Sequence, residues 1–71
     1  MKPNIGSPEG ERIRRLRLRA GMSQESLAQR VGVTSRTIWR LENGPNFNPR
    51  LETLRALAEA LGVPLKELLD V

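Results

Sequence analysis

The 71-residue sequence contains no cysteine and no histidine. These absences exclude disulfides, zinc sites built from cysteine and histidine, cysteine nucleophiles and histidine bases. Apolar runs are also short, since none approaches the roughly 20 residues that a membrane-spanning helix needs, and residues 1–10 lack the apolar core of a signal peptide. We therefore expect a cytoplasmic protein with no cofactor, no metal, no small-molecule ligand and no membrane partner.

Charge is distributed unevenly along the chain. The formal net charge is +4, but residues 1–50 carry ten basic and four acidic side chains, whereas residues 51–71 carry two basic and four acidic ones. A positive end of this kind is typical of proteins that bind a polyanion. The eight carboxylates fall mostly at expected helix starts and exposed faces, without a serine, histidine or lysine set around a pocket, so we do not expect an enzyme.

The stretch from Gln24 to Asn43 predicts two short helices joined by a tight turn. Its apolar residues fall at helical spacing in two groups, which are Leu27, Ala28 and Val31, then Ile38 and Leu41. Ser23 and Thr34 can each accept a hydrogen bond from an amide in the first turn of the helix that follows, and Gly32 can end the first helix in the left-handed region. Because each helix is too short to be stable alone, the two should share one core.

The second of these helices has an informative outward face. Ser35, Arg36, Trp39 and Arg40 are spaced by one, three and four residues, so they share a side opposite Ile38 and Leu41. An α-helix fits the major groove of DNA, and arginine can donate two hydrogen bonds to guanine O6 and N7. This face is therefore predicted to read DNA bases, with arginine favouring G·C pairs. Trp39 has two open interpretations, contact with the DNA or packing against neighbouring side chains.

Helical spacing and cap residues extend the prediction to the whole chain. We expect helices over residues 8–20, 24–31, 35–43, 51–61 and 64–69, in an all-α fold. Residues 1–6 are expected to form a flexible N-terminal arm, and residues 7–71 to form one domain. The core residues expected in the first, fourth and fifth helices are Ile13, Leu16, Ala20, Leu51, Leu54, Leu57, Ala58, Leu61, Leu65, Leu68 and Leu69.

Five segments in order carry a resemblance to a known family: IRRLR, GMSQESLAQRVGV, IWRLENG, LETLRALAEALGV and LKELL. From about Glu11 to Leu69 the chain resembles the lambda-repressor-like family, the XRE-type helix-turn-helix proteins that include phage repressors and Cro. The resemblance implies a compact five-helix DNA-binding domain, with the helix-turn-helix formed by the second and third helices. It also implies double-stranded DNA as a partner and, in many members, a homodimer.

The same resemblance implies roles for particular residues. Arg17 matches a family arginine that pairs with the glutamate at the end of the recognition helix, which here is Glu42, and this pair would brace the first helix against the third. Residues implied to contact DNA phosphates are Gln24, Thr34, Thr37, Asn43, Asn46, Asn48 and Arg50. The dimer interface is implied at a C-terminal apolar patch of Val63, Pro64, Leu65, Leu69 and Val71. The alternative role for the asparagines is turn formation.

The expected function is sequence-specific binding of double-stranded DNA by a transcriptional regulator, most simply a repressor on a near-palindromic operator. An antitoxin or a restriction-modification controller that represses its own operon is equally compatible with these residues. A different class also remains open, because clustered arginines and a tryptophan suit a protein-interaction module that uses the same helix face.

Overall fold

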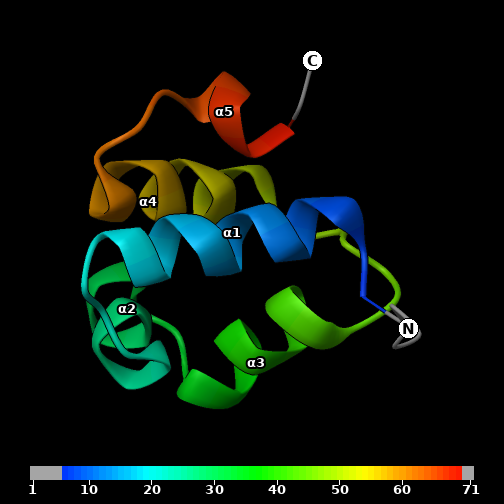
Figure 1. Ribbon diagram of the computed structural model, residues 1–71, viewed down its shortest axis with the longest axis horizontal. Coiled ribbons are helices and arrows are strands. Elements are labelled where there is room, and N and C mark those ends of the chain that lie inside the picture. The colour runs from blue at the N-terminus through cyan, green and yellow to red at the C-terminus, as the bar shows by residue number, and fades with distance from the viewer. Residues whose placement is uncertain (1–5, 70–71) are drawn as a thin grey trace.

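The computed structural model describes residues 6–69, which form five helices and no strand. The helices are α1 (Pro8–Arg19), α2 (Gln24–Val31), α3 (Ser35–Asn43), α4 (Leu51–Leu61) and α5 (Leu65–Leu69) (Figure 1). The all-α, five-helix prediction is confirmed. Its bounds hold for α2, α3 and α4, while α1 ends and α5 begins within one residue of the expected position. The expected N-terminal arm lies outside the described residues except for Gly6.

Hydroxyl side chains define where three of the helices begin. Each accepts a hydrogen bond from the backbone amide three residues later, at 2.9 Å for Ser7, 3.0 Å for Ser23 and 3.2 Å for Thr34. A cap of this kind contributes about 1 kcal/mol, because it satisfies a donor that has no partner inside the helix. Gly32 ends α2 with a φ of 88°, a conformation that a residue with a Cβ adopts only with strain.

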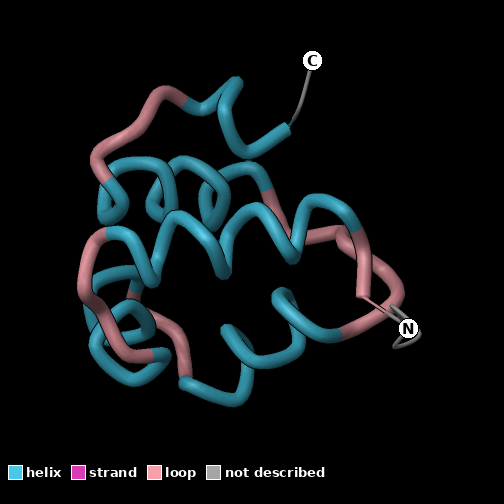
Figure 2. The backbone as a smooth tube through the Cα atoms, viewed as in Figure 1, coloured by secondary structure: helices cyan, strands magenta, loops and turns pink. Residues whose placement is uncertain are grey.

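The helices pack around one apolar core. α2 packs against α3 and α4, α1 packs against α3 and α5, and α4 packs against α5. In Figure 1, α3 and α5 form opposite edges of the domain, and Figure 2 shows the short turn between α2 and α3 and the longer loop from α3 to α4. The buried apolar side chains are Ile13, Leu27, Ala28, Ile38, Leu41, Leu54, Leu57, Ala58, Leu61 and Leu68.

Two predicted core positions are wrong. The structure leaves Leu51 56% exposed, and Ala20 is exposed as well. Leu51 is the first residue of α4 and Ala20 follows the last residue of α1, so both lie at helix ends, beyond the part of each apolar stripe that neighbouring helices cover. Helical spacing identifies the stripe but not where its cover stops. None of the helices in residues 6–69 combines the length and the apolar character needed to span a membrane.

Candidate nucleic-acid interface

The outer face of α3 is formed by its four exposed residues, Ser35, Arg36, Trp39 and Arg40. They are the set that helical spacing assigns to one side, and Ile38, Leu41 and Glu42 are buried on the other side. None of the four outer side chains has a hydrogen-bond or ion-pair partner within residues 6–69. Two guanidinium groups, a hydroxyl and an indole are therefore available to a ligand on one short helix.

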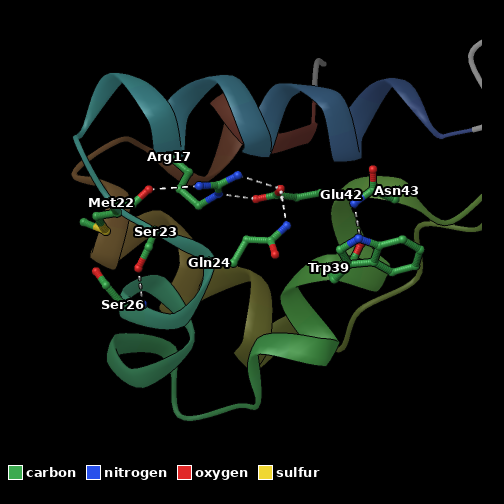
Figure 3. Close-up of polar contacts among 8 residues, drawn as sticks. All are labelled: Arg17, Met22, Ser23, Gln24, Ser26, Trp39, Glu42 and Asn43. Carbon is green, nitrogen blue, oxygen red and sulfur yellow. Dashed lines mark hydrogen bonds and ion pairs between the residues drawn. The ribbon is translucent and has the colours of Figure 1, made fainter.

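A buried ion pair fixes the end of α3 against α1. Arg17 Nε donates to Glu42 Oε2 at 2.6 Å and Arg17 Nη2 donates to Glu42 Oε1 at 3.0 Å (Figure 3). Side-chain exposure is 9% for Arg17 and 0% for Glu42. The third branch of the guanidinium donates from Nη1 to the carbonyl oxygen of Met22 at 2.9 Å. Because arginine holds its donors in a planar fork, this geometry positions three chain segments together, namely α1, the α1–α2 turn and α3.

Gln24 joins the same cluster from the first turn of α2. Its Nε2 donates to Glu42 Oε1 at 3.1 Å, so the Glu42 carboxylate accepts hydrogen bonds from both α1 and α2 (Figure 3). The family resemblance implies that Gln24 bonds a phosphate and steadies the recognition helix, but it did not identify Glu42 as the partner, because nothing in the spacing of residues 24 and 42 signals the contact. An amide nitrogen carries two hydrogens, so one remains for a phosphate. We name Arg17, Gln24 and Glu42 the bracing cluster.

A second feature that sequence reasoning missed is the close approach of Gly10 to α3. Gly10 is buried in the first turn of α1. A Cβ at this position would collide with the carbonyl oxygen of Leu41 and would lie 3.0 Å from that of Glu42. The two backbones therefore approach to a distance that only glycine permits. A glycine inside a helix start was the available signal, because it weakens the helix and so requires a packing reason.

The residues expected at phosphates divide into two groups in the structure. Asn46, Asn48 and Arg50 are exposed in the loop that connects α3 to α4. The remaining side chains bond within the protein: Gln24 bonds Glu42, the Thr34 and Thr37 hydroxyls share a hydrogen bond of 3.1 Å, and Asn43 Nδ2 donates to the carbonyl oxygen of Trp39 at 3.0 Å. The side chains of the second group therefore stabilise α2 and α3 through hydrogen bonds within the protein.

The residues expected at a dimer interface surround α5. Val63, Leu65 and Leu69 are partly buried and pack against the core, while Pro64 is exposed. Val71 lies outside the described residues. In Figure 1 this patch is at the edge of the domain opposite α3. The side chains of Val63, Leu65 and Leu69 therefore combine core packing with a remaining exposed part.

Comparison with known proteins shows similarity over most of the chain. The family described as Helix-turn-helix matches residues 13–68. The chain is 40% identical over 59 residues to the cryptic phage CTXphi transcriptional repressor RstR of Vibrio cholerae. The aligned residues cover 83% of this chain and 52% of RstR. The chain spans about half the length of several curated relatives that it matches.

Two solved structures are similar in both sequence and fold. The restriction-modification controller protein C.AhdI of Aeromonas hydrophila is 37% identical, with a TM-score of 0.78 over 84% of this chain and 89% of that chain. The N-terminal DNA-binding domain of SinR from Bacillus subtilis is 30% identical, with a TM-score of 0.81 over 89% and 91%. The chain belongs to the helix-turn-helix family, and α2 and α3 are the two helices of its helix-turn-helix.

Proposed function

We propose that the chain is a transcriptional regulator that binds double-stranded DNA sequence-specifically by inserting α3 into the major groove. The observation that carries this proposal is the outer face of α3, where Arg36 and Arg40 are exposed without a hydrogen-bond or ion-pair partner among residues 6–69. Such guanidinium groups suit bidentate contacts with guanine O6 and N7. Of the relatives named above, RstR is a transcriptional repressor and the SinR domain binds DNA, and we assign the chain no catalytic role.

Contacts with the DNA backbone would come from both sides of α3. The exposed loop with Asn46, Asn48 and Arg50 follows α3, and the N-terminus of α2 precedes it. Helix N-termini attract phosphate because their first amides lack intrahelical partners. The free hydrogen of the Gln24 amide can add to this site while its other hydrogen holds Glu42. Phosphate contacts of this kind orient a protein on DNA without reading its sequence.

The proposed base contacts predict the result of selecting bound sequences from a random duplex pool at about physiological salt. The wild type should enrich a defined motif, and Arg36→Ala and Arg40→Ala should each lose preference at a different base pair, by about 1 to 3 kcal/mol. Arg15→Ala is the control, since Arg15 is also exposed but lies on α1. It removes the same charge and should leave the motif unchanged. Salt-sensitive background binding without enrichment would instead favour a protein-interaction module.

We further propose that two copies pair through the patch of Val63, Pro64, Leu65 and Leu69. Two-fold pairing would hold two recognition helices about 34 Å apart, one turn of DNA, and so would select a near-palindromic site. Sedimentation should therefore detect a dimer free or on DNA. Pro64→Glu should weaken it without unfolding the domain, because Pro64 is exposed and only its backbone oxygen is bonded, to the Glu67 amide. A monomer under both conditions contradicts this part of the proposal.

A more specific role as a restriction-modification controller is the second candidate. It is favoured by the similarity to C.AhdI, at 37% identity over most of both chains. An antitoxin that represses its own operon would use the same face of α3. The genes next to the coding sequence distinguish these roles, because a controller should adjoin a methyltransferase and an endonuclease, and an antitoxin should adjoin a toxin.

A further inference from the structure

Trp39 is the one exposed large apolar side chain on the outer face of α3. In the described part of the chain, three large apolar residues remain more than half exposed: Leu18 on α1 at 53%, Trp39 at 54% and Leu51 on α4 at 56%. The other exposed residues of α3 are Ser35, Arg36 and Arg40, which are all polar. In Figure 3 the indole projects from α3 beside Asn43 and away from the bracing cluster. Core packing therefore leaves more than half of the surface of this residue uncovered.

The backbone at Trp39 does not depend on the indole either. Asn43 Nδ2 donates to the carbonyl oxygen of Trp39 at 3.0 Å, which closes the last turn of α3 (Figure 3). This bond reaches a main-chain atom, so any residue at position 39 could accept it. The position and exposure of the indole point instead to a ligand that meets the outer face.

The chemistry of that ligand follows from the surrounding side chains. Trp39 stands three residues after Arg36 and one before Arg40, so with α3 in the major groove its ring would meet base pairs next to those that the arginines would contact. An indole has one N–H donor and is otherwise apolar. The hydrogen-bonding groups of the bases dominate the major groove, and the one methyl group there is the C5-methyl of thymine, which 5-methylcytosine also carries at the same ring position.

We propose that Trp39 packs against the C5-methyl group of a pyrimidine beside the pairs read by Arg36 and Arg40, and so determines specificity for that group. This inference rests on the proposed DNA binding by α3. It adds an apolar contact to the two arginine contacts. Thymine and 5-methylcytosine are two sources of the same methyl group, and the affinity measurements below separate them.

The test compares wild type and Trp39→Ala on the duplex that the selection enriches. In one series each thymine of the motif is replaced by uracil, and in the other each cytosine is replaced by 5-methylcytosine. In the uracil series, the wild type should bind about fourfold more weakly when the contacted thymine loses its methyl group. If the contacted base is a cytosine, the wild type should instead bind about fourfold more tightly when 5-methylcytosine replaces it. Trp39→Ala should bind both versions equally. The series that responds identifies the base.

Leu18→Ala is the matched control, because Leu18 is equally exposed but lies on α1. It should keep the full methyl dependence, and Trp39→Phe should keep part of it by retaining an aromatic ring. The inference is overturned if wild-type affinity is insensitive to every methyl change. It is also overturned if Trp39→Ala keeps the methyl dependence of the wild type, that is, if it weakens binding to the methylated and unmethylated duplexes by the same factor. Either result with an enriched motif leaves the proposed function intact, whereas the absence of any enriched motif refutes the proposed function itself.

Discussion

Replacing Glu42 by glutamine is expected to lower the free energy of unfolding by about 3 to 5 kcal/mol, because the substitution leaves the Arg17 guanidinium buried without its charged partner. The glutamine also cannot accept all three hydrogen bonds that the carboxylate accepts from Arg17 and Gln24, since one of its two oxygens becomes an amide donor. A chain of 71 residues has a total stability of about 4 to 11 kcal/mol. The variant should therefore be close to unfolding at 37 °C, as urea denaturation monitored by circular dichroism will measure.

The control for this variant is Glu59→Gln, which changes the same chemical group at an exposed position of α4. Its effect should stay within about 0.5 kcal/mol. Replacing both partners, Arg17→Met with Glu42→Leu, should recover much of the lost stability, because an apolar pair leaves no buried charge unmatched. The double variant still lacks the arginine bond to the Met22 carbonyl. An effect of Glu42→Gln no larger than that of Glu59→Gln would show that the pair does not brace the fold.

Gly10→Ala is expected to destabilise the domain although alanine is the better helix former. The preference of a helix for alanine over glycine contributes about 1 kcal/mol in favour of the variant. Against it, the new methyl group would collide with the Leu41 carbonyl oxygen, which is backbone and cannot move aside without shifting α3. Overpacking of this kind typically costs about 1 to 3 kcal/mol and more where backbone must move. We therefore expect a net loss of about 1 to 2 kcal/mol in urea denaturation.

Arg15→Ala provides the comparison for Gly10→Ala, since it also places alanine in α1 but at an exposed position. It should leave stability nearly unchanged. Gly10→Ala should in addition weaken binding to the enriched duplex, because a shift at the end of α3 reorients the helix that carries the outer face. If the variant is at least as stable as the wild type, the gain in helix propensity is larger than the cost of the collision between α1 and α3. The two helices would then move apart without a loss of stability.

Both substitutions act on the same arrangement. The proposed reading of DNA by the outer face of α3 requires the helix to be held at a defined angle, and a helix of 9 residues is too short to be stable alone. Gly10 lets the backbones of α1 and α3 approach, and the bracing cluster ties Glu42 to α1 and α2. The buried side of α3 thus orients the exposed side.

Sequence alone determined the local features of this protein. Helix bounds follow from short-range rules, since Ser23 and Thr34 cap their helices within three residues and Gly32 ends α2 through its own φ angle. The outer face of α3 follows from helical spacing, which assigns sides without knowing the partner. The pairing of Arg17 with Glu42 came from family resemblance, because 25 residues separate the two and no periodicity connects them.

Tertiary structure alone decided the contacts between segments distant in sequence. Gln24 bonds Glu42 across 18 residues, and Gly10 meets Leu41 at a helix crossing, because packing brings the start of α2 and the start of α1 to the end of α3. Packing also exposed Leu51, whose spacing matches a core position. Spacing along one helix specifies which side of it is apolar, but only the neighbouring helices determine how far that side is covered and which polar groups meet there.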